Sequence, residues 1–540
     1  MTTLIERPEA PTVRLRRPQR DASWRPAPAP KPPKRARHRR PEGSRFSSDT
    51  WIVLALLVVV LGVQAWNITG FPPISADEGT YLAQAWAVAR GDGLAHYTYW
   101  YDHPPLGWMQ IALLSWLPGL LAPGALAVAG GRLIMLVVTG AAVVLLYKLG
   151  DRLDLPRWAS VLAVLLYGLS PLAVIMHRQI YLDNVAVVWM LAAMVLALSP
   201  RRHLWHHVAA GICVAVAVLS KETMLLVFPA VLIALWRGTH KSTRTFSLVG
   251  FGSGLVLVGS FYPLYALIKG ELFPGRDHVS LLGAIFFQLG GREGSGSVFT
   301  PGSSAYITVG SWLYYDKVLI FAGLAAALAG LFLRRLWVPA VAVLLLAVMV
   351  LRPGGYLPSM YIIQALPFLA LSVAGMVDVL ADRASRLLGN WQPVRRKVVI
   401  GYVAMVLAGL LAPVWWQGNA AALTRQDTQS YRDAVAWIGS SVQDKDHKRI
   451  VVDDGMWLDM VKQDFRPGTG AIWFYKIDLD PEVMTHLPGG WRDIDYVVST
   501  PMLRDRPDVL PTVTAALAHS RVLATFGEGD NRVEIRQITT

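Results

Sequence analysis

The sequence predicts a polytopic α-helical membrane protein with about eleven transmembrane helices and a small C-terminal α/β domain outside the membrane. Three observations support this fold class. Of 540 residues, 54% are hydrophobic and only 16% are charged, whereas charged residues make up about a quarter of an average soluble domain. Eleven apolar runs alternate with basic loops. After Trp416 the composition changes to that of a soluble α/β segment.

The first fifty residues form a basic segment rich in proline and alanine, with cations such as Arg14, Lys31 and Arg40. This composition does not support a buried core, so we expect residues 1–50 to be a disordered tail. The formal net charge of +14 invites a nucleic-acid-binding interpretation, but much of the excess lies in this tail. We favour a cytoplasmic tail that fixes orientation by the positive-inside rule and contacts anionic lipid, with no nucleic acid as partner. The only cysteine, Cys213, rules out an internal disulfide framework.

Residues 51–417 carry the apolar runs, several of which are shorter than the ~20 residues of a typical span. Basic loops between them mark the cytoplasmic side. Leu106–Leu121 is also apolar, but counting it as a span would reverse every later orientation, so we predict an interfacial or re-entrant helix there. The C-terminus is then external, in a multi-pass protein of the plasma (inner) membrane. The predicted spans are Trp51–Asn67, Gly131–Leu149, Trp158–Met176, Asn184–Leu198, Leu204–Leu219, Thr223–Trp236, Phe246–Ile268, Val318–Leu333, Trp337–Leu351, Ser359–Leu380 and Val398–Trp416.

The first external loop, residues 68–130, holds two adjacent carboxylates, Asp77 and Glu78. We expect Tyr81–Arg90 to form a short helix along the membrane surface, with the two acids at its N-terminal end, where the helix dipole favours negative charge. A carboxylate there is solvated yet adjoins hydrocarbon, which suits an acid or base that acts on a lipid-borne substrate. The alternative is a helix N-cap followed by a capping acid.

Further polar residues gather at the external ends of the predicted spans, as an active site at the bilayer surface requires. Each group also has a plain structural explanation: a helix-entry turn, a short wet loop, a salt-bridged tight turn, or a belt of tyrosines at the membrane interface. The residues are Asp102 and His103 before Pro104-Pro105, then His177, Arg178 and Asp183, then Lys221 and Glu222, then Arg276-Asp277-His278, and finally Arg352, Tyr356 and Tyr361.

Residues 424–540 are predicted to form a soluble domain, which is large enough for a core of its own. Helix-like stretches cover Ser430–Ser441 and Asp508–His519. The last two strand-like stretches are separated by a glycine-containing turn and predict a terminal hairpin over Arg521–Arg536. The strand-like stretches are Arg449–Val452, Ile494–Val498, Arg521–Phe526 and Val533–Ile535.

These motifs, in this order, resemble the GT-C glycosyltransferases, and more closely the protein O-mannosyltransferase and aminoarabinose transferase group. Asp77-Glu78 is similar to the Asp-Glu motif of the first external loop in that group, and Leu182-Asp183 is similar to its second acidic site. His103-Pro104-Pro105-Leu106-Gly107 is similar to its Pro-Pro-Leu element, with the histidine that protein mannosyltransferases have there. The resemblance covers Trp51 to about Trp416.

The resemblance implies transfer of a mannose- or pentose-type sugar from a polyprenyl-phosphate donor on the external face, with inversion at the anomeric carbon. Asp77 is then the general base that removes the proton of the acceptor hydroxyl, while Glu78 and Asp183 orient substrate hydroxyls. Aminoarabinose transferases can hold a divalent metal ion in places comparable to Asp102 and His278, so metal dependence stays open. The residues expected to bind the substrate or the lipid phosphate are His103, Arg178, Lys221, Arg352, Tyr356 and Tyr361.

The expected partners are the polyprenyl-phosphate sugar, membrane lipids and an envelope acceptor, which is a polysaccharide, a lipid or a protein. The loop 269–315 lacks the insert of eukaryotic protein mannosyltransferases, which weakens the case for a protein acceptor. Two alternatives stay open: a polytopic lipid or sugar transporter or flippase, and a non-catalytic envelope scaffold. A transporter is expected to show related halves, and the sequence shows no such symmetry. The alanine- and arginine-rich, lysine-poor composition suggests an actinobacterial envelope.

Overall fold

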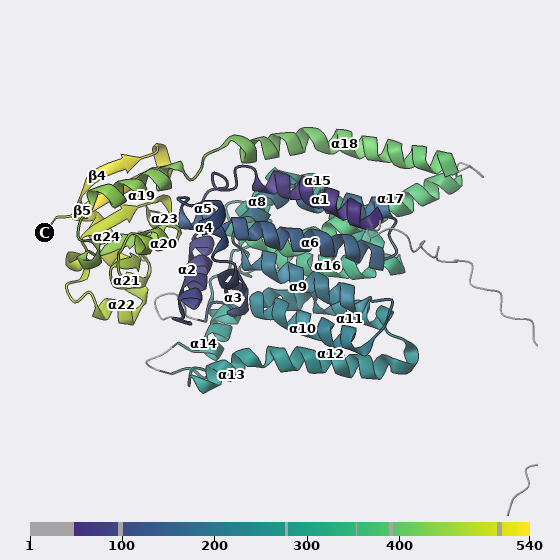
Figure 1. The fold of residues 1–540 in the computed structure, drawn as a ribbon, viewed down its shortest axis with the longest axis horizontal. Coiled ribbons are helices and arrows are strands. Elements are labelled where there is room, and N and C mark those ends of the chain that lie inside the picture. The colour runs from purple at the N-terminus through teal and green to yellow at the C-terminus, as the bar shows by residue number, and fades with distance from the viewer. Residues whose placement is uncertain are drawn as a thin grey trace, which may run out of the picture. The chain divides into compact units, whose positions relative to one another are not determined.

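The computed structural model of the chain describes residues 48–94, 101–275, 279–352, 354–387, 393–504 and 510–539. Residues 1–47 of the predicted tail, and the segment Arg276-Asp277-His278 with its proposed metal ligand, lie outside the described residues. Ser48–Thr540 forms one compact unit that combines a bundle of apolar helices with a mixed sheet (Figure 1).

Each predicted apolar run falls on a helix or on consecutive helices. Within the described ranges, six helical stretches are long and apolar enough to cross a membrane, and a seventh is added if α7 and α8, bent by 63°, count as one span. Shorter apolar helices such as α9 and α10 accompany them, so the number eleven stays a prediction. The helices are α1 (Ser48–Ala65), α6 (Leu133–Arg152), α7 (Arg157–Leu169), α8 (Pro171–Arg178), α9 (Leu182–Ala197), α10 (Leu204–Ser220), α11 (Phe228–Gly238), α12 (Arg244–Gly259), α13 (Phe261–Ile268), α15 (Ser304–Gly330), α16 (Trp337–Leu351), α17 (Ile362–Leu387) and α18 (Pro393–Thr424).

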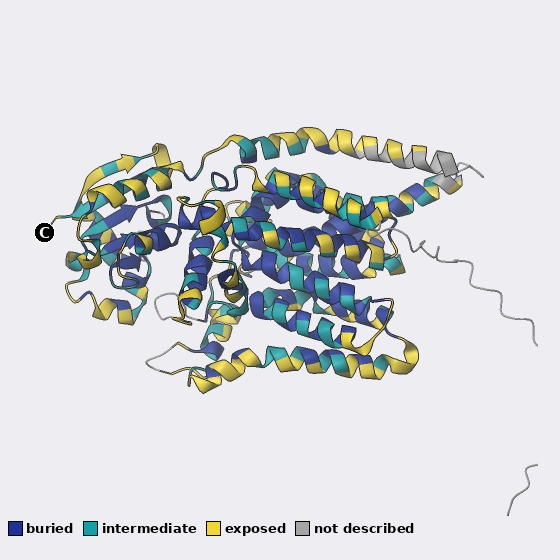
Figure 2. Cartoon of the chain, viewed as in Figure 1, coloured by how far each residue is buried: buried dark blue, intermediate teal, exposed yellow. Residues whose placement is uncertain are grey.

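Burial separates inner from outer helices (Figure 2). In the most apolar 18 residues of Ser359–Ala384, a stretch that holds most of α17, 78% of the residues are buried. The corresponding share in α1 is 17%. The exposed side chains of α1 are large and apolar, for example Trp51 and Val58. An apolar helix surface of this kind is stable where lipid covers it. The protein is therefore a multi-pass membrane protein with α17 near the centre of its bundle.

The break between α7 and α8 is held by polar groups inside the bundle. The hydroxyl of Ser170 donates to the carboxylate of Asp316 at 2.6 Å, and the indole N–H of Trp415 donates to the same oxygen at 2.9 Å. Asp316 itself interrupts α15, with φ −154° and ψ 76°. These contacts join α15 and α18 to the bend, after which α8 runs to Arg178 and α9 begins at Leu182.

The loop between α1 and α6 contains a helix that lies across the ends of the apolar helices in Figure 1. This helix, α2 (Ala76–Arg90), includes the predicted surface helix and ends at Gly91, whose φ of +90° favours glycine. The predicted interfacial stretch Leu106–Leu121 consists of two helices, which are separated at residues 114–116. The loop helices are α2, α3 (Leu106–Leu113), α4 (Leu117–Leu121) and α5 (Ala127–Gly131), and α14 (Leu281–Phe286) lies in a later loop.

The C-terminal segment contains a five-stranded sheet with the order β2-β1-β3-β5-β4. β1 pairs in parallel with β2 and β3, while β5 pairs in antiparallel fashion with β3 and β4. The strands are β1 (Ile450–Val452), β2 (Ala471–Trp473), β3 (Tyr496–Ser499), β4 (Ser520–Phe526) and β5 (Val533–Ile538). The helices are α19 (Gln429–Ser441), α20 (Asp454–Lys462), α21 (Lys476–Leu479), α22 (Pro481–Thr485), α23 (Pro501–Arg504) and α24 (Pro511–Ala518).

The four predicted strands and the terminal hairpin of β4 and β5 are confirmed. The sequence did not reveal β2, because its three residues are all buried and too few to show an alternating pattern. It also did not reveal α20. The helix expected over Asp508–His519 begins at Pro511, and residues 508 and 509 lie outside the described part of the chain.

α20 packs directly against α2. The rings of Trp86 on α2 and Trp457 on α20 meet edge to face, with 5.7 Å between their centroids. A Cβ atom added to Gly79 would lie only 2.1 Å from the carbonyl oxygen of Asp454, so a glycine is required for the two backbones to approach this closely. The C-terminal segment is therefore in contact with the helix turn that carries the acidic pair.

Candidate active site

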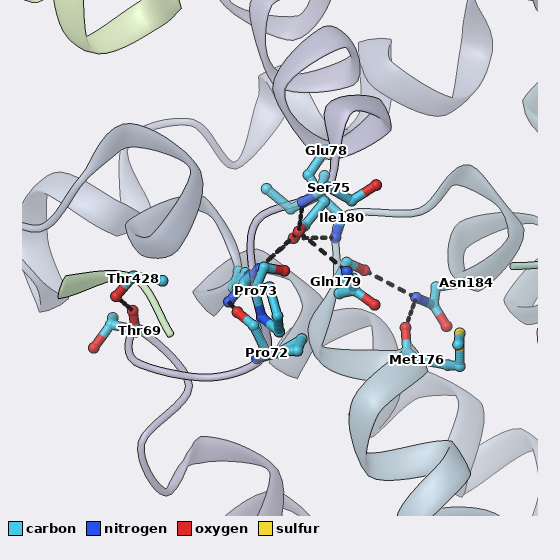
Figure 3. A network of polar contacts seen from close by, with 11 residues as sticks. Thr69, Pro72, Pro73, Ser75, Glu78, Met176, Gln179, Ile180, Asn184 and Thr428 are labelled. Carbon is cyan, nitrogen blue, oxygen red and sulfur yellow. Dashed lines mark hydrogen bonds and ion pairs between the residues drawn. The ribbon is translucent and has the colours of Figure 1, made fainter. Parts of the chain in front are cut away.

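Glu78 anchors the N-terminus of α2 (Figure 3). Its carboxylate is fully buried, and Arg132 donates to both oxygens, with Nε 2.8 Å from Oε1 and Nη2 2.7 Å from Oε2. The main-chain N–H groups of Ser75 and Ile180 and the side-chain amide of Gln179 donate to the same carboxylate. Ser75 and Glu78 form a capping box. Five donors bind this carboxylate. We therefore propose that Glu78 holds α2 in position and does not bind substrate hydroxyls.

Arg132 ties this anchor to the preceding loop. Its side chain is fully buried, and Nη1 donates to the carbonyl oxygen of Pro72 at 2.7 Å while Nη2 donates to that of Pro73 at 3.1 Å. Arg132 was not among the predicted site residues. The sequence signal for this residue is that it is a single arginine at the start of an apolar run. Such a cation needs a buried acid as its partner.

Asp77 has a different environment from its neighbour. It lies half-buried in the first turn of α2, and it makes no hydrogen bond or ion pair with any other residue that the structure describes. A carboxylate without a protein partner is available to accept a proton from a bound hydroxyl. Two adjacent acids therefore differ in what surrounds them: one is fully engaged by the protein and the other is open.

Tyr81, one turn after Asp77 on the same face of α2, lies among four carboxylates. Its side chain is buried, and burial is the largest cause that raises the pKa of its hydroxyl. Four acids raise that pKa further: Asp77 on α2, Asp102 in the loop before α3, Asp183 at the start of α9 and Glu222 in the turn after α10. The structure thus places three predicted site residues, Asp77, Asp102 and Asp183, near Tyr81 and Glu222.

His103 links a buried lysine to a half-buried glutamate. Nζ of Lys221 lies 3.0 Å from Nε2 of His103, and Oε2 of Glu222 lies 3.1 Å from Nδ1. An ammonium only donates and a carboxylate only accepts, so these partners fit the tautomer with its proton on Nδ1. Burial opposes the charge of Glu222, but His103 and Lys221 outweigh it and hold the pKa of Glu222 at about 2.

Lys221 is the buried cation of the site, with 2% of its surface exposed. Burial lowers the pKa of Lys221, yet the carboxylates of Asp183 and Glu222 outweigh burial and raise this pKa, which keeps the ammonium charged. Its Nζ lies 5.9 Å from the centre of the Tyr361 ring. The side-chain amide of Gln364 donates to Oδ1 of Asp183 at 2.6 Å and holds this acid in place.

Arg292 adds a second cation that the sequence analysis did not select. Its guanidinium lies 3.4 Å from the centre of the Tyr356 ring and donates to the side-chain oxygen of Gln288 at 2.9 Å. The amide of Gln288 reaches the main-chain oxygen of Asp102 at 3.5 Å, which joins this group to the loop of His103. No sequence pattern marks Arg292, since it lies in a polar loop between glycines.

The structure does not bring Arg178 to this group. Arg178 is fully buried and donates to the main-chain oxygens of Val63 and Ala422, so it ties α8 to α1 and α18. Arg352 is exposed and has no side-chain hydrogen bond or ion pair with another described residue. His278 lies outside the described residues, so a metal site that includes it stays a prediction.

Among the described residues, no three His, Cys, Asp or Glu side chains are placed to hold a metal ion. Asp102, the other proposed ligand, accepts from the amide of Gln84, with Nε2 at 3.3 and 3.4 Å from its two oxygens. Burial raises the pKa of Asp102, and the neighbouring His103 opposes this effect.

Residues 102–263 match the family model of dolichyl-phosphate-mannose-protein mannosyltransferases. No curated protein sequence matches the chain. The structure is similar to that of ArnT from Cupriavidus metallidurans bound to undecaprenyl phosphate, with a TM-score of 0.57 and 14% identity, over 92% of this chain and 99% of that chain. It is also similar to the archaeal oligosaccharyltransferase AglB from Archaeoglobus fulgidus in complex with an inhibitory peptide and a dolichol-phosphate, with a TM-score of 0.52 and 12% identity, over 90% of this chain and 74% of that chain.

The chain has the GT-C fold. The match to the mannosyltransferase family model, together with this fold, identifies it as a glycosyltransferase. The matched segment of this GT-C enzyme contains residues of the group around Tyr81 and Lys221. They are Asp102, His103, Asp183, Lys221 and Glu222. Asp77 and Arg292 lie outside the matched segment and join the GT-C site through the fold.

Proposed function

We propose that the protein transfers a mannose- or pentose-type sugar from a polyprenyl-phosphate donor to a hydroxyl group of an envelope acceptor, with inversion at the anomeric carbon. One observation carries this proposal: the open carboxylate of Asp77 shares a polar site with the buried ammonium of Lys221. Inverting transfer needs a base for the acceptor and positive charge for the departing phosphate. The complexes of ArnT with undecaprenyl phosphate and of AglB with dolichol-phosphate support the donor class.

On the acceptor side, Asp77 takes the hydroxyl proton as the acceptor oxygen attacks the anomeric carbon. The new carbon–oxygen bond forms on the face opposite the phosphate, which inverts the configuration. The network of Glu78 and Arg132 fixes the first turn of α2 and thereby the position of Asp77. A base must lie within hydrogen-bond reach of the proton it accepts, so a rigid helix end is useful here.

On the donor side, the bond between the anomeric carbon and the phosphate oxygen breaks, and negative charge grows on the departing polyprenyl phosphate. Lys221 and Arg292 are placed to stabilise this charge, with Tyr356 and Tyr361 beside them. Asp183 and Glu222 keep Lys221 charged, and His103 orients it. We propose Arg292 for the role that the sequence analysis gave to Arg178 and Arg352.

We further propose that this site faces the extracytoplasmic side, with the tail of residues 1–50 in the cytoplasm. The basic loops between the apolar runs support this orientation. The segment 424–540 then lies outside the cell, next to the acceptor.

The test is transfer of labelled sugar from polyprenyl-phospho-mannose and from polyprenyl-phospho-arabinose to membrane acceptors by the wild-type protein and by Asp77→Asn. We expect turnover with one donor in the wild type and loss of turnover in Asp77→Asn, whose shape is nearly unchanged. A parallel reaction with a chelator tests the metal. Equal turnover in both proteins would exclude Asp77 as the base, and no turnover with either donor would refute the proposed donors.

A further inference from the structure

Two buried oxygen atoms, one on α2 and one on α20, have no hydrogen-bond donor within the described part of the protein. They are Oε1 of Gln84 and Oδ1 of Asp454. Gln84 is 1% exposed and Asp454 is 4% exposed. A buried acceptor without a donor is costly, and such atoms in native structures usually meet a water molecule or a ligand.

Both residues lie on the two helices that meet at the proposed base, α2 and α20. Gln84 follows Asp77 by seven positions on α2, which puts the two side chains on one helix face, together with Thr80 and Tyr81. Asp454 begins α20, and its carbonyl oxygen faces Gly79, two residues after Asp77. Burial is the largest cause that raises the pKa of Asp454, and the carboxylates of Asp453 and Asp77 raise it further.

The two sides of this site suit different parts of the substrates. Lys221 and Arg292 bring positive charge, as a phosphate requires. Around Asp77 the protein offers acceptors, namely the carboxylates of Asp77 and Asp454 and the oxygen of Gln84. An anionic ligand carries acceptors of its own and is repelled by carboxylates, whereas sugar hydroxyls supply donors.

We infer that Asp454, from the C-terminal segment, and Gln84 bind hydroxyl groups of the acceptor, and that the acceptor is a neutral, hydroxyl-rich glycan. This inference rests on the proposed function. The C-terminal segment then completes the acceptor site, since Asp454 reaches Asp77 only because α20 packs on α2. A charged headgroup or a peptide hydroxyl satisfies fewer of these oxygens.

Asp454→Asn and Asp453→Asn form a matched pair of variants for the test. Asp453 caps α20, accepting from the N–H of Met456 at 3.0 Å and from the hydroxyl of Tyr431 at 2.7 Å, so its carboxylate is engaged within the domain. The reactions use a neutral alkyl mannoside, the same mannoside carrying a phosphate, and a serine-containing peptide as acceptors. Binding of undecaprenyl phosphate to each protein reports on the donor side.

We expect the wild type to use the neutral mannoside best. Asp454→Asn should raise KM for it about tenfold or more, because an NH2 group replaces one carboxyl oxygen of Asp454 in the acceptor site, with undecaprenyl phosphate binding unchanged. Asp453→Asn should leave this KM within about twofold. An unchanged KM in Asp454→Asn, an equal loss of undecaprenyl phosphate binding, or a wild-type preference for the phosphorylated mannoside or the peptide would overturn the inference. Absence of wild-type transfer from any donor would instead refute the proposed function, and this inference with it.

Discussion

Replacing Glu78 by Gln tests whether the two neighbouring acids have separate roles. The substitution keeps the shape of the side chain but turns one oxygen into an NH2 group. If that oxygen is Oε1, Nε of Arg132 and the N–H of Ile180 then face a donor in place of an acceptor. If that oxygen is Oε2, three donors face the NH2 group, and they come from Arg132, Ser75 and Gln179. Each buried group left unpaired costs roughly 1–3 kcal/mol, and breaking a buried ion pair costs roughly 3–5 kcal/mol.

We therefore expect Glu78→Gln to lower the free energy of unfolding by about 3–5 kcal/mol, measured by thermal or denaturant unfolding of the detergent-solubilised protein. Asp77→Asn is the control. It removes no protein hydrogen bond within the described residues, so its stability should match that of the wild type while its turnover disappears. A Glu78→Gln protein with wild-type stability and the turnover of Asp77→Asn would refute this division of roles, since it would place Glu78 in the chemistry.

Two further predictions concern Lys221 and the contact between α5 and α20. Lys221→Met keeps the length of the side chain but removes its charge, and we expect binding of undecaprenyl phosphate to weaken about 10- to 100-fold, as measured by titration. Unchanged binding would exclude Lys221 from the phosphate site. Asp459 accepts from the N–H of Ala127 at 2.8 Å, and burial raises the pKa of Asp459 from 3.8 to about 7. A raised carboxyl pKa stabilises the folded protein fully below about pH 4 and loses this contribution as the pH rises through about 7, at most roughly 4 kcal/mol. Asp459→Asn should therefore flatten the fall in melting temperature between pH 4 and 8, and an unaltered pH profile would contradict this account.

Several features of the site followed from local sequence. Asp77-Glu78 at the start of a helix, the helix end at Gly91 and the His103-Pro104-Pro105 turn all depend on neighbouring residues only. Such short-range signals survive in a single sequence. The partners of these residues did not follow, because Glu78 meets Arg132 across 54 positions and His103 meets Lys221 across 118.

The sequence by itself determined the membrane class, the helical bundle and most strands of the C-terminal sheet. Hydrophobic runs and alternating residues report directly on whether a segment is surrounded by lipid, protein or water. It also predicted the site at the ends of the apolar helices, since ionisable residues are costly anywhere deeper.

The tertiary structure alone decided how these residues are used. It showed that Glu78 is enclosed by donors while Asp77 is open, and that Arg178 holds main-chain oxygens of α1 and α18. It also brought Asp454 from the C-terminal segment to Asp77 through the close approach of α20 at Gly79. These outcomes depend on which helices pack together, and long-range packing leaves no periodic pattern in the chain. A residue type sets which hydrogen bonds a side chain can make, and only the fold sets which of them are already made.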